Sequence, residues 1–396
     1  MTRPITSALV ITVMLAGCAT GNHKNRETVV AGTAYQAHYR INEDKLPPHT
    51  LKSLELNAKK CQSKVTGGGA VTVAEPELLT RGDLVSVLVG EDKTFSGKYV
   101  ISRDGTLKLP HLKGVVARGR TVGEVGDELA RRLVAADFYR SAPQVSVRID
   151  DFAAASVHVA GAVFEPGTVT VGNVSGDDRD KARQAATGAS TDGRTMAAAL
   201  RASGGIRPDA DLSRVALHRD GKRTVLDLRG AMDGRRFADL MLLAGDQIEV
   251  PSRTCFQEKL MAPSPLTAPG VKVFISNLTK PADANALSAI GKDARELRYG
   301  TRFVQAVVGM NCVGGARSTN ANRYAVLFSR NPITGESIVI ERSIEDMMER
   351  ADRDELDPYI LPGDAIACYD STVTNITEIA RAITGVIGAS IPLLAL

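Results

Sequence analysis

Residues that could do chemistry are few in this chain, and they are scattered. None of the six histidines stands four residues from another, so the spacing of a helical metal site is missing. Carboxylates are numerous, but the sequence places no pair for acid–base work, and no Gly-x-Ser-x-Gly nucleophile motif occurs. We therefore predict no catalytic residue, no metal site and no cofactor, and we do not expect an enzyme.

Cys18 is the exception, because its surroundings predict a covalent modification. It follows the basic residue Arg3, an apolar run from Ala8 to Leu15, and two small residues. That layout is typical of a secretory signal and is too short to span a bilayer. The ending Leu15-Ala16-Gly17-Cys18 resembles the bacterial lipobox, which implies cleavage before Cys18 and acylation of the new N-terminus. The alternative is an ordinary signal peptide with a chance cysteine.

The lipobox resemblance also implies a location. A single acyl chain holds a protein at a membrane only marginally, so a lipoprotein carries more than one. Residue 19 is Ala and not Asp. By resemblance to known sorting rules, this favours the outer membrane, and the covalent lipid on Cys18 is the only attached group that we expect.

The other cysteines are Cys61, Cys255, Cys312 and Cys368. They form no Cys-x-x-Cys pair, and an even number suits an exported, oxidised protein. The sequence does not fix their pairing. We favour Cys312–Cys368, since both fall in one internal repeat, and the alternative is four free thiols.

Composition excludes several classes of protein. Apolar residues make up 43% and charged residues 24%, which is ordinary for a globular chain. The formal net charge is +4 without a long basic block, so nucleic acid is not the expected partner. Aromatic residues make up 4% and Trp is absent, which excludes an aromatic-rich stacking platform. No apolar stretch is long enough for a bundle of conventional transmembrane helices.

Changes in composition and in predicted secondary structure divide the chain into seven segments. Alternating strands and a capped helix beginning at Thr121, with Glu124 in the capping-box position, predict an α/β module. We assign these segments in order: a signal peptide (1–17), a tether and flap (18–76), the α/β module (77–150), a β-rich module (151–253), a linker with a strand at Val271 to Ser276 (254–300), a second β-rich module (301–370) and a C-terminal helix (371–396).

The two β-rich segments read as copies of one module. In the first copy a strand from Val157 precedes a helix from Thr195 to Ser203, two hairpin strands and a closing Gly-Asp strand at Gly245. In the second copy we predict the first strand at Phe303 to Gly309, and a matching Gly-Asp strand begins at Gly363.

Residues 374–390 predict an amphipathic helix. Its length suits the apolar thickness of an outer membrane, and Pro392 follows it. The pattern alone is equally consistent with a helix lying flat on a surface. For a spanning helix in a ring, we expect lipid-facing residues at Ile376, Ile379, Ile383, Val386 and Ile387 and lumen-facing residues at Thr377, Glu378, Arg381 and Thr384.

Several of these motifs carry a family resemblance. Gly82-Asp83 with the strand after it, the run from Gly97 to Pro110, and the strand Pro143 to Val147 resemble the polysaccharide export module of the outer-membrane polysaccharide export (OPX) family. The strand from Val157 with Glu165-Pro166-Gly167 resembles the soluble-ligand-binding β-grasp (SLBB) module that follows it there. Residues 311–317 look closer to the capsule-export branch that ABC transporters serve. The absence of Trp departs from relatives with aromatic residues at the membrane boundary.

The resemblance implies an α+β multidomain fold: an export module, two SLBB-type β-grasp modules and a C-terminal transmembrane helix in a ring oligomer, an octamer in the family. It implies a channel for capsular polysaccharide in the outer membrane of a Gram-negative bacterium, mostly periplasmic, with the C-terminus at the cell surface. The implied partners are an inner-membrane polysaccharide co-polymerase or an adaptor of an ABC exporter. The alternative is a lipoprotein that binds glycan or export partners without forming a pore.

Overall fold

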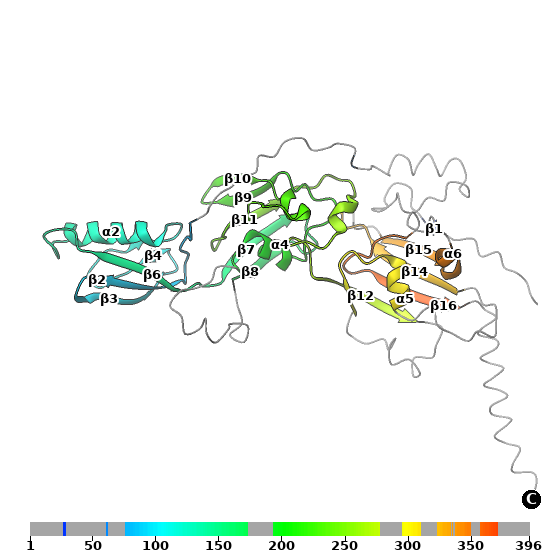
Figure 1. The fold of residues 1–396 in the computed structure, drawn as a ribbon, viewed down its shortest axis with the longest axis horizontal. Helices are drawn as coiled ribbons and strands as arrows, with labels where there is room; N and C mark the ends of the chain where they lie inside the picture. The colour runs from blue at the N-terminus through cyan, green and yellow to red at the C-terminus, as the bar shows by residue number, and fades with distance from the viewer. Residues whose placement is uncertain are drawn as a thin grey trace, which may run out of the picture.

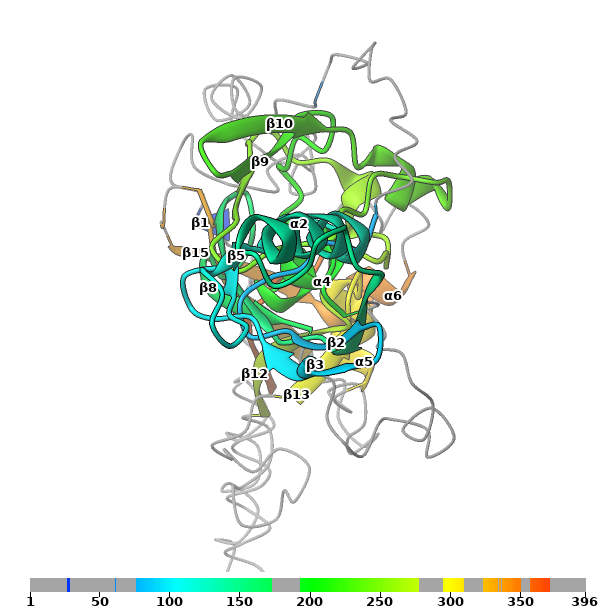
Figure 2. The same cartoon turned by 90° about the vertical axis from the view of Figure 1, so that its left-hand side faces the viewer.

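The structure, a computed structural model, describes residues 27–28, 61, 76–172, 193–277, 295–309, 323–333, 335, 337–349 and 357–370. These form three modules in a row, each with its own sheet and its own apolar core (Figure 1). Seen along the long axis, the first module lies in front of the other two (Figure 2). The architecture is therefore mixed α/β, and the chain is elongated along the line of its modules.

The first module (residues 76–152) packs one helix on a three-stranded antiparallel sheet of order β3-β2-β6. Every second residue of β2 is buried, as the alternation predicted. The predicted capping box is present at Thr121 and Glu124, where α2 begins. The elements are β2 (Leu84–Val89), β3 (Asp92–Val100), β4 (Thr106–Leu107), β5 (Val115–Val116), α2 (Val122–Ala135) and β6 (Val145–Asp151).

The middle module (residues 153–253) contains a five-stranded mixed sheet of order β10-β9-β11-β7-β8, in which only β11 and β7 are parallel among its described strands. Thr195 caps the predicted helix, which is α4, and the buried residues of α4 face β7 and β8. The elements are β7 (Ala155–Gly161), β8 (Gly167–Val171), α4 (Met196–Ala202), β9 (Val215–Arg219), β10 (Lys222–Leu226), the 3-10 helix η4 (Arg229–Asp233) and β11 (Gln247–Val250).

The third module (residues 254–370, joined by β1) has a six-stranded sheet of order β1-β15-β14-β16-β12-β13. Helices α5 and α6 contribute Phe303, Val307, Ile344 and Met347 to the core on one face of this sheet. The elements are β1 (Glu27–Thr28), the 3-10 helix η5 (Glu258–Met261), β12 (Gly270–Asn277), β13 (Arg295–Arg298), α5 (Phe303–Gly309), β14 (Arg323–Arg330), β15 (Ser337–Ser343), α6 (Ile344–Glu349) and β16 (Ala365–Asp370).

The internal repeat is present, but two predicted boundaries are wrong. The order β15-β14-β16-β12-β13 reproduces β10-β9-β11-β7-β8, with β12 parallel to β16 as β7 is parallel to β11. The first strand of the second copy is therefore β12, so β12 and β13, which fall within residues 254–300, belong to the second copy and not to a linker. Phe303–Gly309 is the helix α5 and not a strand, because Phe303, Ala306 and Val307 are buried at helical spacing.

Candidate functional site

A turn built on a Gly-Asp pair precedes one central strand in each module. Asp83, Asp246 and Asp364 are buried, and their carboxylates accept hydrogen bonds from the backbone N–H three residues earlier, at 2.7, 2.8 and 2.8 Å. The preceding glycines have φ angles of 89°, 93° and 85°, which a residue with a Cβ adopts only with strain. The third turn confirms the predicted match between the two Gly-Asp strands. The first shows that Arg81-Gly82-Asp83 is a structural turn.

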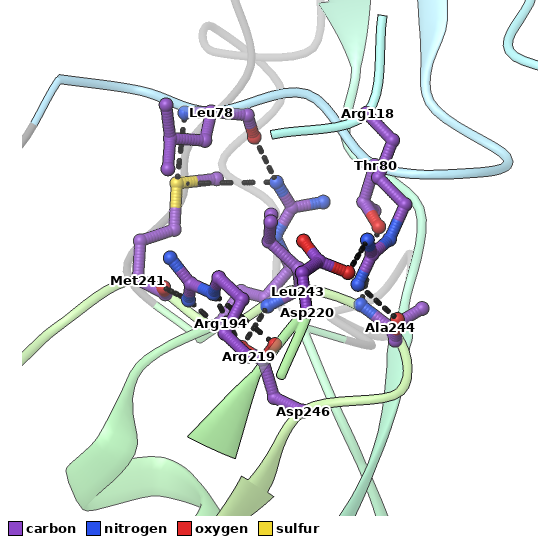
Figure 3. Close-up of polar contacts among 10 residues, drawn as sticks. All are labelled: Leu78, Thr80, Arg118, Arg194, Arg219, Asp220, Met241, Leu243, Ala244 and Asp246. Carbon is purple, nitrogen blue, oxygen red and sulfur yellow. Dashed lines mark hydrogen bonds and ion pairs between the residues drawn. The ribbon is translucent and has the colours of Figure 1, made fainter. Parts of the chain in front are cut away.

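Two of these turns meet where the first module joins the middle module (Figure 3). The guanidinium of Arg194, which is 1% exposed, donates to the Asp83 carboxylate at 2.8 Å and to the Leu78 carbonyl at 2.8 Å. The same guanidinium lies 4.8 Å from the centre of the Phe152 ring. Arg194 belongs to the middle module, whereas Asp83, Leu78 and Phe152 belong to the first. The contact is therefore a buried ion pair between modules.

Further polar contacts lie around Arg194 (Figure 3). Arg118 of the first module pairs with Asp220 and donates to the Ala244 carbonyl at 3.3 Å. The Ala244 N–H donates in return to the Thr80 hydroxyl at 3.1 Å. Because Thr80 and Ala244 belong to the two Gly-Asp turns, the turns bind one another directly across the junction.

Burial governs the electrostatics of the junction. Loss of water raises the pKa of Asp83 above its usual value, and the charge of Arg194 opposes that rise without cancelling it. Asp246 is held by a second arginine, since Arg219 donates to it at 2.8 Å and to the Met241 carbonyl at 2.6 Å. Asp83, Asp220 and Asp246 at this boundary thus each have a guanidinium partner. This arrangement suits two modules held in a fixed relative orientation rather than two that slide past one another.

The middle and third modules are joined by a different set of contacts. Arg207 pairs with Asp209 at 2.8 Å and donates to the Pro332 carbonyl at 3.1 Å. The buried Tyr299 hydroxyl donates to the Ile206 carbonyl at 3.4 Å, and desolvation raises the pKa of Tyr299 strongly. Both junctions therefore combine buried polar contacts between residues far apart in the sequence.

A disulfide joins Cys61 to Cys255, close to the start of the third module. The Cα atoms of the two cysteines are 5.5 Å apart, and the cysteines are 194 positions apart in sequence. Cys368 is disulfide-bonded as well. Cys312 lies outside the described residues, so the predicted Cys312–Cys368 pair stays a prediction.

Most of the predicted functional residues also lie outside the described residues. They include Cys18, the lipid-facing Ile376, Ile379, Ile383, Val386 and Ile387, and the lumen-facing Thr377, Glu378, Arg381 and Thr384. In the ranges that the structure covers, no helix is long and apolar enough to cross a membrane. The same ranges hold no group of three or more His, Cys, Asp or Glu side chains that could bind a metal.

Sequence reasoning missed the ion pair at the first junction. Asp83 stood out as part of a family motif, whereas Arg194 is the last residue of a polar, Ala-rich stretch of sequence (172–194) that pointed to no partner. The pair spans 111 residues, and local patterning carries no information on such a contact. The one available sign of a buried ion pair was the position of Arg194, just before the Thr195 N-cap, where a polar stretch meets a helix of the core.

Comparison with known proteins gives a family match over the first module. Residues 71–150 match the family described as polysaccharide biosynthesis/export protein. The chain is 25% identical over 275 residues to the EPS I polysaccharide export outer membrane protein EpsA of Ralstonia solanacearum, a match covering 65% of this chain and 66% of that protein. It is 30% identical over 159 residues to EpsA of Ralstonia nicotianae (strain ATCC BAA-1114 / GMI1000), covering 39% of this chain and 36% of that protein.

These alignments span just under two thirds and about one third of the relatives' lengths. The family match coincides with the module that contains Asp83, α2 and the three-stranded sheet. The predicted resemblance of this module to the polysaccharide export module is thereby confirmed.

Proposed function

Because this chain is an OPX-type protein with a polysaccharide export module, we propose that it is a subunit of an outer-membrane channel that exports polysaccharide. The observation that carries the proposal is the coincidence of the family match with a complete folded module at one end of a row of three. We propose capsular polysaccharide as the substrate, since the resemblance of residues 311–317 favours that branch.

The position of β1 supports an anchored orientation. Thr28 pairs with Val339 at the edge of the third-module sheet, ten residues after Cys18. Ten residues span at most about 35 Å, so a lipid on Cys18 would hold the third module near the membrane. The first module, at the other end of the row, would then extend into the periplasm toward an inner-membrane co-polymerase or an ABC-exporter adaptor (Figure 1).

The module junctions support a role of the chain as a rigid part of the channel wall. A row of modules that rotated freely could not keep a continuous passage aligned between two membranes. The buried Asp83–Arg194 pair and the contacts of Arg118 oppose such rotation. In the proposed assembly, copies of the chain stand side by side as a ring, with eight copies suggested by the family resemblance.

Residues 371–396 would complete the passage through the outer membrane. One amphipathic helix cannot hide its polar face in lipid, so the spanning form requires a ring with Thr377, Glu378, Arg381 and Thr384 around water. Ile376, Ile379, Ile383, Val386 and Ile387 would face lipid. Transport would then need no catalysis, only weak and repeated polar contacts that let the glycan move on.

Oligomeric state and C-terminal exposure test the proposal together. A channel subunit should run as a detergent-resistant oligomer, and a tag after Leu396 should be labelled on intact cells. The second candidate, a tethered binder without a pore, predicts labelling only after the outer membrane is permeabilised. The amphipathic pattern of residues 374–390, equally suited to a surface helix, is the observation that keeps this candidate open.

A further inference from the structure

The sheet of the middle module has one face in the core and one face toward solvent. Helix α4 lies against β7 and β8, and every second residue of the strands joins it in the core. Because side chains alternate along a strand, the residues between them point away from α4. In the described strands these outward residues are polar or small, except Val225 on the edge strand β10.

Three of the outward residues form a row across the middle of this face. Gln247 on β11 lies opposite His158 on β7 and, on its other side, opposite His218 on β9. His158 and Gln247 are exposed, and the side chain of His218 is 37% exposed. Neighbouring strands are about 4.8 Å apart, so the two imidazole rings stand roughly 10 Å apart with the Gln247 amide between them.

Each imidazole is held in place by one hydrogen-bonding neighbour. The Nδ1 atom of His158 lies 2.8 Å from the Thr168 hydroxyl, and the Nε2 atom of His218 lies 3.3 Å from the Glu249 carboxylate. Such contacts are made in the plane of the ring and leave its flat face available. A ring already fixed by its neighbour loses little conformational entropy when a ligand packs on it.

The second copy of the module also has a pair of rings at these positions. The Gly-Asp turns set the alignment, so that Gln247 after Asp246 corresponds to Ala365 after Asp364. The cross-strand neighbours of Ala365 are Phe274 and Phe328, which therefore correspond to the two histidines. Contact with water does not require planar rings. Their recurrence on both sides of the central strand indicates a ligand with flat faces of its own.

We propose that this face of the middle module is a contact site for the exported polysaccharide, with a sugar residue over Gln247 between His158 and His218. The proposal rests on the export function proposed above. The C–H face of a sugar packs on the flat face of a side-chain ring, as apolar surface does elsewhere. The Gln247 amide has two donors and an acceptor for the hydroxyl groups of the sugar.

The row fits a sugar chain better than it fits a second protein. The centre of a protein–protein interface is built on large apolar or aromatic anchors and excludes water. The row His158-Gln247-His218 has no large apolar side chain, and each of its members forms hydrogen bonds with hydroxyl groups. A hydroxyl-rich polymer is therefore the occupant that this chemistry matches.

The charges on this face predict weak contacts with little dependence on salt. The outward residues of the described strands include one arginine, Arg223, and one glutamate, Glu249, whose charges balance. Binding through ring faces and neutral hydrogen bonds is screened little by salt. It is also weak enough to let the polymer move on, as passage through a channel requires.

The absence of Trp permits a direct test, because one introduced indole reports on its own surroundings. The protein is purified in detergent from the outer membrane as His218→Trp, which keeps a ring in the row. The control is Thr224→Trp, since Thr224 is exposed but belongs to the opposite face of the sheet. The probe is polysaccharide purified from the surface of the cells that make this chain. It should shift the emission of His218→Trp to the blue, equally in low and high salt, and leave Thr224→Trp unchanged.

A second experiment removes the rings. His158→Ser with His218→Ser should weaken binding of the same polysaccharide roughly tenfold, because two ring faces lose their contacts. In cells, this variant should reach the outer membrane in wild-type amount and lower surface polysaccharide several-fold. Lys222→Ser with Thr224→Ser, on the same sheet but outside the row, is the matched control and should export normally. Circular dichroism spectra that match the wild type show that both variants fold.

Three results would overturn the proposal. One is that neither indole responds to the polysaccharide, and another is that both respond alike. The third is a response of His218→Trp that disappears in high salt, since it would be a contact between charges. Cells that lack the chain provide the separate test of export itself. Lost export in those cells, together with normal export by the doubly substituted histidine variant, would reject this site and leave the proposed function standing.

Discussion

The Nη1 atom of Arg194 lies 2.8 Å from the Oδ1 atom of Asp83, and the two residues belong to different modules. Both side chains are almost completely buried, at 1% and 0% exposure. Breaking a buried ion pair by removing one partner leaves the other charge without compensation in a medium that stabilises it poorly. The orientation of the first module on the middle module therefore depends on this contact.

Substitution of Arg194 should destabilise that junction. We expect Arg194→Met to lower the free energy of unfolding by about 3–5 kcal/mol, because the Asp83 carboxylate loses its counter-charge. Urea unfolding of the full mature chain measures the change. Arg223→Met, on the exposed edge strand β10, is the control and should unfold at the wild-type urea concentration. Equal midpoints for the two variants would contradict a structural role for the pair.

The capping box of α2 should make stability depend on pH in one direction. Hydrogen bonds from the Thr121 N–H and hydroxyl lower the pKa of Glu124, so its folded-state pKa lies below its unfolded-state pKa. Its contribution is present above the unfolded-state pKa and is lost as the pH falls through the folded-state pKa. Glu124→Ala should therefore be less stable than wild type at pH 7, and the gap should close in acid.

Thermal unfolding at a series of pH values measures that gap. Asp127→Ala, an exposed residue of the same helix, is the matched control and should show no such pH-dependent loss. A gap between Glu124→Ala and wild type that is the same at pH 7 and in strong acid would refute the prediction.

Disulfide mapping checks the covalent arrangement. Peptides from the non-reduced protein should link Cys61 to Cys255, and the chain-entropy effect of so long a loop stabilises the folded state by up to about 5 kcal/mol. We further predict that Cys312→Ser leaves this link intact and exposes Cys368 to alkylation under denaturing conditions. A Cys368 thiol that stays protected in that variant would exclude the Cys312–Cys368 pair.

Lipid attachment is tested at Cys18. Wild-type protein should incorporate labelled palmitate and lose residues 1–17, whereas Cys18→Ser should do neither. Cys61→Ser, which leaves the lipobox untouched, is the control and should still carry lipid. Labelled Cys18→Ser protein of wild-type mature mass would exclude the anchor.

Local patterns predicted the elements and not their contacts. The alternation in β2 and the capping box at Thr121 were sufficient because short-range geometry determines both. The segment Phe303–Gly309 misled because Val304, Val307 and Val308 favour a strand, whereas burial of one face as a helix decides the outcome. The Asp83–Arg194 pair and the Cys61–Cys255 bond join residues 111 and 194 positions apart, and the sequence holds no periodic signal for either.

Surface polysaccharide is the most direct measure of the central claim, that this chain carries polysaccharide through the outer membrane. Cells that lack the chain should lose surface polysaccharide and retain it in the periplasm. Wild-type protein should restore it, whereas a chain ending at residue 370 should reach the outer membrane without restoring it. Surface polysaccharide at wild-type levels in cells without the chain would contradict the export role, and full restoration by the truncated chain would contradict the C-terminal pore.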